Sequence, residues 1–234
     1  MTLTRVETVT TADGGFDLPL WLPPAGSGPA VLVIQEIYGV GEYIRKVCED
    51  LAALGYVAAA PDLFWRLQPN WRSSHDEEGT KRSIEMGARF DFAQGVADSI
   101  TALRHLTALP EVTGKTGVLG FCLGGTVAYG VAAEAEPDAL VSLYGSGVPD
   151  MLDALPRITC PAQFHFGGSD PYITRDRVAR VEEAVAAHPG AEILVEEEAG
   201  HAFHNFVSPI FHNPEAGARA WRSITAFLAR HLTP

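Results

Sequence analysis

Short apolar runs alternate along the chain with longer segments whose apolar residues recur at helical spacing. The runs are bounded by turn residues, as strands are, and they occupy positions 5–10, 16–22, 30–35, 56–64, 115–121, 138–145, 161–168 and 191–197. The periodic segments and one run of small residues predict helices at 44–54, 96–106, 124–135, 178–185 and 221–228. This alternation predicts an α/β fold, with a mostly parallel central sheet and helices on both faces.

The first two strands are expected to form an N-terminal β-hairpin, because the turn residues Asp13, Gly14 and Gly15 separate them. Positions 65–80 are polar, aromatic and aperiodic, which indicates an excursion over the top of the sheet. The chain contains no internal repeat, low-complexity tract or long linker. We therefore expect a single domain over residues 1–234.

The chain carries a formal net charge of −12. This charge argues against a nucleic-acid partner or an anionic membrane surface, since it would neutralise neither. No segment approaches the roughly 18 consecutive apolar residues of a membrane span, and the N-terminus lacks the pattern of a signal peptide. These features predict a cytoplasmic protein without a membrane partner. Its oligomeric state stays open, with a monomer favoured.

The three cysteines, Cys48, Cys122 and Cys160, are too few for a disulfide framework, and their spacing matches no zinc site. His201 and His204 lie three residues apart, but no cysteine or carboxylate nearby completes a set of metal ligands. We therefore expect reduced thiols, no metal and no other cofactor.

Cys122 stands where a predicted strand turns into a predicted helix, in the segment GVLGFCLGG. The flanking Gly120 and Gly124 fit a nucleophile elbow, G-x-S-x-G, with sulfur in place of the hydroxyl. Side chains at the two glycines would collide with neighbouring backbone in so tight a turn. The turn also places the thiol at a helix N-terminus, which favours a thiolate. The alternative is a small buried cysteine with no chemical role.

Asp170 and His201 follow the last two predicted strands, where an open parallel sheet binds its ligands. Asp170 precedes a proline, so it could also serve as a turn or cap residue. The chain order, however, is nucleophile, then acid, then histidine, as expected for α/β-hydrolases. We interpret Cys122 as nucleophile, His201 as general base and acid, and Asp170 as the group that orients His201.

An oxyanion hole is expected from two backbone N–H groups, those of Leu123 and Ile37. Leu123 follows the nucleophile, and Ile37 lies in the loop after the strand at 30–35. The same loop contains Glu36, a carboxylate that needs a partner so close to a buried strand. Glu36 is either catalytic or an anchor for its loop.

These positions together resemble the dienelactone hydrolase (carboxymethylenebutenolidase) family of α/β-hydrolases. The resemblance is close to full length and includes QEIYGV, PDLF, GFCLGG, GGSDPYI and GHAFHN. It implies that Cys122, Asp170 and His201 form a triad. It also implies that Glu36 partners the resting thiol until an anionic substrate displaces the carboxylate. Substrates of the family are small enol lactones that bear a carboxylate.

The chain departs from the family at the two arginines that hold the substrate carboxylate. Asn205 and Thr80 stand at the corresponding positions. Lys81 and Arg82, beside Thr80, are candidate replacements, unless they are only the solvated start of a helix. The remaining candidates for substrate binding are aromatic. Tyr38 is one of them, and Phe64, Trp65 and Trp71 would line a broader apolar pocket.

The sequence thus predicts a hydrolase of small esters or lactones that works through a thioester on Cys122. Two alternatives stay open. One is a non-catalytic relative that binds a small ligand as a receptor. The other is an acyltransferase that passes the acyl group from the same triad to an acceptor other than water.

Overall fold

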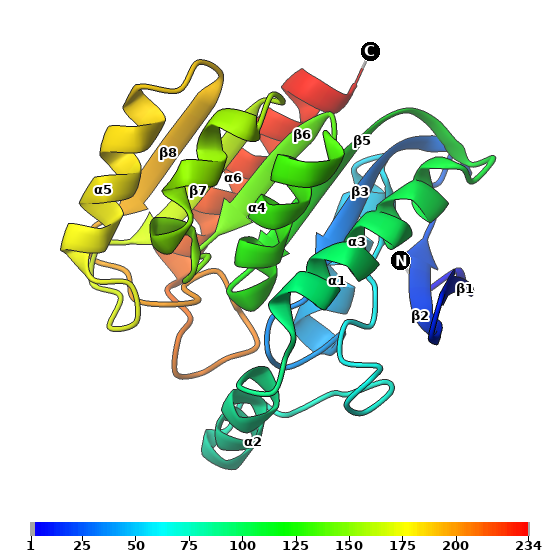
Figure 1. Cartoon of the computed structure of the whole chain (residues 1–234), viewed down its shortest axis with the longest axis horizontal. Helices are drawn as coiled ribbons and strands as arrows, with labels where there is room; N and C mark the ends of the chain where they lie inside the picture. The colour runs from blue at the N-terminus through cyan, green and yellow to red at the C-terminus, as the bar shows by residue number, and fades with distance from the viewer. Residues whose placement is uncertain (1–2, 234) are drawn as a thin grey trace.

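The structure, a computed structural model, describes residues 3–233. Its centre is an eight-stranded sheet in the order β1-β2-β4-β3-β5-β6-β7-β8 (Figure 1). The strands are β1 Arg5–Thr11, β2 Gly14–Trp21, β3 Gly28–Ile34, β4 Val57–Ala59, β5 Val112–Phe121, β6 Ala139–Leu143, β7 Ala162–Gly167 and β8 Ala191–Glu196. The pairs β1–β2 and β2–β4 are antiparallel, and every other pair is parallel. The predicted hairpin and mostly parallel sheet are confirmed.

Helices cover both faces of this sheet (Figure 1). One face packs against α1 (Glu42–Ala53) and α6 (Pro214–Leu232). The other packs against α3 (Phe92–Thr107), α4 (Leu123–Ala135) and α5 (Arg175–Ala186). The strands β3, β6 and β7, which lie between the two layers, are mostly apolar and almost wholly buried. Continuous apolar runs are therefore read correctly as strands covered on both sides.

The segment predicted as extended over 56–64 is a strand only at Val57–Ala59. Pro61 has no N–H for a ladder hydrogen bond, and the Asp62 carboxylate then accepts the backbone N–H groups of Phe64 and Asn70. These bonds turn the chain away from the sheet. The prediction of an extended run to residue 64 is thus corrected.

The excursion at 65–80 is irregular as predicted, but its end is helical. Asp76 caps α2 (Glu77–Gly87) by accepting the N–H of Gly79 at 2.7 Å. This helix stands away from the layers, beyond the carboxyl ends of the strands at the bottom of Figure 1. Two 3-10 turns after β6 were also not predicted, η1 (Val148–Asp150) and η2 (Leu152–Arg157). Both contain a proline, which favours a short turn over a longer helix.

No helix within residues 3–233 combines the length and apolar character needed to cross a bilayer. The same described residues contain no group of three His, Cys, Asp or Glu side chains arranged to hold a metal ion. His204 Nδ1 instead forms a hydrogen bond with the hydroxyl of Tyr43, with 2.7 Å between the atoms. The pKa of His204 is lowered to about 4 because the ring is buried.

Candidate active site

Cys122 occupies a strained bend between β5 and α4, with a φ angle of +54°. A side chain at Gly120 would overlap the backbone of Gly124. A side chain at Gly124 would overlap the carbonyl of Ile34 at the end of β3. The two glycines therefore let the strand, the bend and the helix approach closely enough to present the sulfur beyond the sheet. This is the mechanical reason predicted from the sequence.

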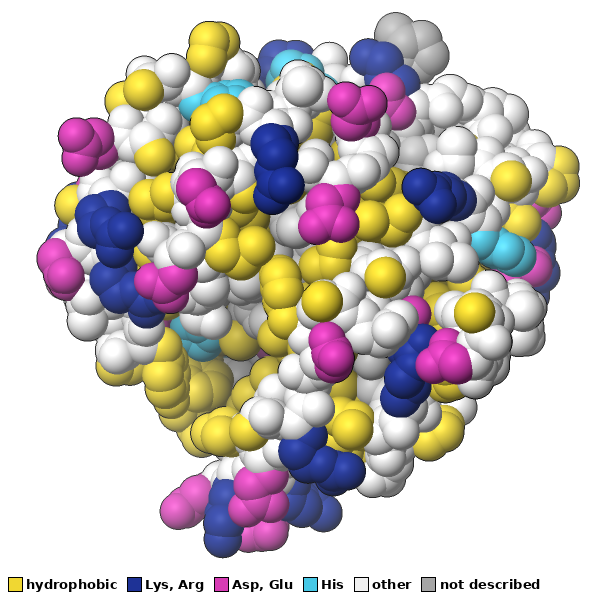
Figure 2. Space-filling model, viewed as in Figure 1, with side chains coloured by type: hydrophobic (Ala, Val, Ile, Leu, Met, Phe, Trp, Pro, Cys, Tyr) yellow, Lys and Arg dark blue, Asp and Glu magenta, His cyan; other side chains and the backbone are white. Residues whose placement is uncertain are grey.

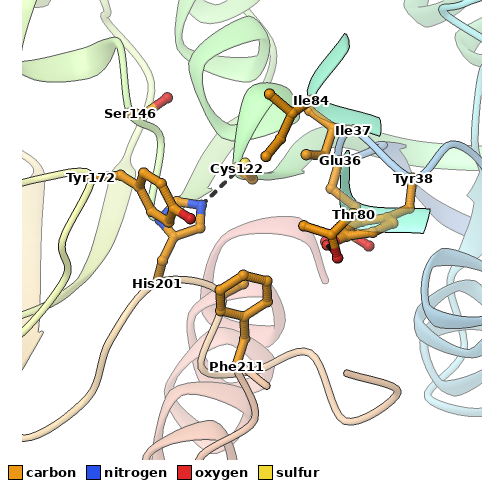
Figure 3. Close-up of a pocket in the computed structure, with 11 residues that line it drawn as sticks. Glu36, Ile37, Tyr38, Thr80, Ile84, Cys122, Ser146, Tyr172, His201 and Phe211 are labelled. Atoms are coloured by element: carbon orange, nitrogen blue, oxygen red, sulfur yellow. Dashed lines mark hydrogen bonds between the residues drawn. The ribbon is translucent and has the colours of Figure 1, made fainter. Parts of the chain in front are cut away.

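His201 forms hydrogen bonds with both Cys122 and Asp170, and Figure 3 shows the contact between His201 and Cys122. His201 Nε2 is 3.1 Å from the Cys122 sulfur, and Nδ1 is 2.7 Å from an Asp170 oxygen. Both His201 and Asp170 are buried. Three segments far apart in the sequence thus bring a thiol, an imidazole and a carboxylate within contact distance, an arrangement that suits a catalytic triad.

The Asp170 carboxylate is fixed by the loop after β7. One oxygen faces His201, and the other accepts the backbone N–H groups of Tyr172 at 2.7 Å and Ile173 at 3.1 Å. Asp170 therefore makes the contacts of a turn residue and also contacts His201, so the two interpretations of the sequence do not exclude each other. This arrangement leaves the carboxylate no freedom to turn away from the imidazole.

The electrostatics of His201 favour its protonated form. Burial lowers the pKa of His201, but the negative charge of the Cys122 sulfur and the hydrogen bond to Asp170 outweigh it and raise the pKa to about 10.

Two backbone N–H groups remain available beside the sulfur. Within residues 3–233, neither the N–H of Ile37 nor that of Leu123 donates to a protein acceptor. The loop that carries Ile37 is held by Trp71, whose indole N–H donates to the Ile37 carbonyl at 3.2 Å. Leu123 begins α4, where free N–H groups and the helix dipole favour negative charge. The positions suit a developing oxyanion.

Glu36 does not contact the thiol through a hydrogen bond in this structure. Its carboxylate accepts from the Asn205 amide, at 3.1 Å to each oxygen, and lies 2.9 Å from His75 Nε2. Its side chain is 2% exposed. The expectation that Glu36 partners the resting thiol is corrected, because Cys122 already faces His201 and the carboxylate already has two partners. Glu36 joins three loops, as the anchoring interpretation predicted.

A cavity of about 240 Å³ opens next to the sulfur. Figure 3 shows Tyr172 and Phe211 on the side of His201, with Ile37, Ile84, Tyr38 and Thr80 on the other side of Cys122. The full lining is Glu36, Ile37, Tyr38, Thr80, Ile84, Cys122, Ser146, Tyr172, His201, Ala202 and Phe211. Most of this wall is apolar or aromatic, as in many small-molecule sites.

Of the aromatic residues predicted to bind substrate, Tyr38 lines the cavity. Phe64 is fully buried against Phe90, and the Trp65 indole donates to Asp98 at 3.0 Å. Neither lines the cavity, so these two predictions are corrected. Both belong to the start of the excursion, which packs back onto the core.

Lys81, Arg82 and Asn205 do not line the cavity either. The two cations are exposed residues of α2, which matches the solvated-helix alternative. Asn205 is fully buried, and its amide N–H group is directed at Glu36. Its carbonyl accepts the N–H groups of Val207 and Ser208. These predictions for direct substrate binding are therefore corrected.

The sequence interpretation missed His75, Ile84, Tyr172 and Phe211. Tyr172 could have been found, because it lies two residues after Asp170 in a loop already assigned to the site. The other three belong to irregular segments or to an undetected helix. No periodicity or motif directs their side chains to the cavity.

The fold and the placement of nucleophile, acid and histidine define this protein as an α/β-hydrolase. The profile of the Dienelactone hydrolase family matches residues 18–232, and the chain belongs to that family. It is thus a hydrolase of the class that acts on esters and lactones.

Named relatives cover nearly the whole chain. A carboxymethylenebutenolidase from Pseudomonas sp. (strain P51) is 36% identical over 99% of this chain and 97% of its own length. Carboxymethylenebutenolidase 1 from Cupriavidus pinatubonensis is 33% identical over 88% of each chain. The solved structure of a putative dienelactone hydrolase from Klebsiella pneumoniae superposes with a TM-score of 0.83 at 27% identity, covering 97% of this chain and 98% of that one.

Proposed function

We propose that this protein hydrolyses small esters or lactones through a thioester on Cys122, with His201 and Asp170 completing the catalytic triad. The observation that carries the proposal is the 3.1 Å contact between the Cys122 sulfur and His201 Nε2. This contact aligns the attacking atom with its proton-transfer partner at the wall of a cavity that can admit a small ligand.

In the acylation half, the Cys122 sulfur attacks the carbonyl carbon and a C–S bond forms. The carbonyl oxygen becomes an oxyanion, which the N–H groups of Ile37 and Leu123 stabilise. The tetrahedral intermediate then collapses and the C–O bond to the leaving alcohol breaks. His201 Nε2 donates its proton to that oxygen, while Asp170 stabilises and orients the ring.

In the deacylation half, His201 is left neutral and accepts a proton from water at Nε2. The hydroxide attacks the thioester carbon, and the same two N–H groups stabilise the second oxyanion. The C–S bond breaks, the carboxylic acid leaves, and the proton on His201 returns beside the sulfur. The cycle consumes one water molecule and needs no cofactor.

The test is to trap the acyl group on its residue. An activated ester, such as 4-nitrophenyl butyrate, is mixed with the enzyme and the reaction is quenched in acid. The protein is then digested, and the masses of its peptides are measured by mass spectrometry. We expect one butyryl group on the peptide that contains Cys122. Cys122→Ala removes both the adduct and the turnover, whereas Cys160→Ser, which alters a buried cysteine, retains them.

Turnover at the wild-type rate in Cys122→Ala, or an adduct on another residue, contradicts the proposal. Binding of the ester without turnover by the wild-type chain favours the receptor alternative. Product analysis with added alcohols or thiols separates the hydrolase from the acyltransferase, because an acyltransferase forms the new ester or thioester in place of the acid.

A further inference from the structure

Building on the proposed hydrolase function, we propose that this site selects esters and lactones that are uncharged around the reacting carbonyl and rejects those that carry a carboxylate there. The group it takes is apolar and about the size of a benzene ring with a short substituent. The proposal follows from the charge, the shape and the neighbours of the cavity beside Cys122.

The described part of the cavity wall contains no positively charged side chain that could pair with an anionic substrate. Among the described residues that line it, none is Lys or Arg, and the one carboxylate is Glu36. Ile37, Ile84, Tyr172 and Phe211 give this wall large apolar or aromatic side chains. A substrate carboxylate placed here would lose its hydration without gaining an ion pair, which is costly.

The Glu36 carboxylate would repel a substrate carboxylate, and its neighbours hold it in position. The carboxylate is buried and already has two partners, Asn205 and His75. His75 is held in turn by the ring of Tyr38, with 4.0 Å between ring centroids. A second carboxylate in the same cavity would face a fixed like charge at low dielectric. This anchored carboxylate therefore disfavours anionic ligands.

The nearby cations are directed elsewhere. Thr80 and Ile84 lie four residues apart on α2, so they share the face that lines the cavity. Lys81 and Arg82 are one and two residues further round the helix from Thr80, and both are exposed. A cation on this helix is therefore near the site in sequence but not on its wall.

Arg177, at the opposite rim, is also engaged. Its guanidinium donates to the carbonyls of Tyr172 at 3.2 Å and Ser146 at 3.1 Å, and it pairs with Asp150. These bonds hold the guanidinium against the backbone of two residues, Tyr172 and Ser146, that line the cavity, and Arg177 itself does not line it. No free cation at this rim replaces the missing ones among residues 3–233.

The volume of the cavity and the residues at its rim both favour an apolar ligand. An apolar protein cavity of about 150 Å³ can bind benzene, and this cavity measures about 240 Å³. Ile84 and Tyr172 are each 53% exposed at its edge. Figure 2 shows a hollow just above α2, with hydrophobic side chains gathered around it. Exposed apolar groups around a hollow indicate a ligand site more often than a random surface does.

The test compares two 4-nitrophenyl esters of nearly equal shape, the 6-methylheptanoate and the hydrogen adipate. The first ends in an isopropyl group and the second in a carboxylate. We expect kcat/KM to be about 100-fold higher for the neutral ester, because one charged group is the only large difference. Equal values, or a preference for the adipate, overturn the inference.

Matched variants locate the cause. Thr80→Arg places a cation on the wall, and we expect the adipate's relative kcat/KM to rise about tenfold or more, whereas Thr80→Gln leaves the preference unchanged. Ile84→Arg, at a half-exposed position, gives the same gain if Thr80→Arg does not fold. Lys81→Met is expected to change neither value, and a fall for the adipate alone would show that Lys81 serves the site.

Failure of this inference is distinct from failure of the proposed function. If Cys122→Ala hydrolyses both esters as fast as the wild type, the thioester mechanism is wrong and the inference falls with it. If turnover depends on Cys122 but shows no charge preference, the mechanism stands and the selectivity proposal is wrong.

Discussion

The two sides of the cavity are built in different ways. On one side, Cys122, Asp170 and His201 each follow the end of a parallel strand, and their hydrogen bonds connect the ends of β5, β7 and β8. On the other side, Tyr38, Thr80 and Ile84 lie on a loop and on α2, a helix that stands away from the layers (Figure 1). The groups that we propose to react thus lie at the ends of core strands, whereas Tyr38, Thr80 and Ile84 lie on peripheral segments.

This difference separates chemistry from selectivity. The proposed triad depends on the ends of parallel strands meeting at one edge of the sheet. Substitutions of Cys122, Asp170 or His201 therefore remove a group that no other residue replaces. Loops and a peripheral helix can change their side chains at small cost to the core. We therefore expect substitutions on the reacting side to abolish turnover. Substitutions on the wall are expected to change which substrate is preferred.

The largest expected effect is on the reacting side, at Asp170. Asp170→Asn keeps the turn but removes the charge that orients and stabilises protonated His201. We expect kcat to fall by about 100-fold or more. The loss is a test of function rather than folding, because Asn can still accept the N–H groups of Tyr172 and Ile173.

The pH profile sharpens this prediction. His201 must be protonated to donate to the leaving group, so kcat/KM of the wild type falls as pH rises through the His201 pKa of about 10. Asp170 helps to raise that pKa, so the alkaline limb moves to lower pH in Asp170→Asn. Asp176→Asn, at an exposed position of α5, is the control. If the alkaline limb does not move in Asp170→Asn, Asp170 does not raise the pKa of His201, and the role proposed for it is wrong.

The next effect is expected at the junction between the two sides, where His75 and Asn205 hold Glu36. His75→Phe keeps the ring stacked on Tyr38 but removes the hydrogen bond to the buried carboxylate. We expect a loss of about 1–3 kcal/mol in the free energy of unfolding, because a buried charge loses a partner. Urea denaturation measures it, and kcat/KM should fall less than in Asp170→Asn.

A double-mutant cycle tests the cause. Glu36→Gln removes the charge, so His75→Phe should cost less in that background than in the wild type. Equal costs in the two backgrounds would show that the loss comes from packing around Tyr38, and the anchoring role of Glu36 would be wrong.

The sequence predicted the reacting side better than the wall, for physical reasons. Buried strands leave continuous apolar runs, and the elbow requires Gly120 and Gly124, so these residues alone are enough to place Cys122 at the end of a strand. Chain order then placed Asp170 and His201. The elbow is a signal local to a few residues, and neither it nor the chain order depends on how the loops pack.

The wall leaves no such signal. Glu36 meets His75 and Asn205 only because three loops converge, and nothing near Glu36 in the sequence specifies those partners. The aromatic residues of the excursion were expected to line the cavity, yet Phe64 and Trp65 pack onto the core. Apolar character alone does not distinguish a loop residue that faces a ligand from one that faces the protein.

The smallest expected effect lies on the wall itself, at Ile84. The side chain is about half exposed on α2, so Ile84→Ala should change the free energy of unfolding by less than about 0.5 kcal/mol. For the neutral ester we expect kcat/KM to fall about fivefold, since about 1 kcal/mol of apolar contact is lost. Hydrolysis of the adipate should change less, because its charged end gains little from that contact. Ile210→Ala, another exposed isoleucine but outside the cavity, is the matched control. Equal losses of kcat/KM for both esters would mean that Ile84 contributes to binding without selecting between substrates. The proposed division between a side for chemistry and a side for selectivity would then be wrong.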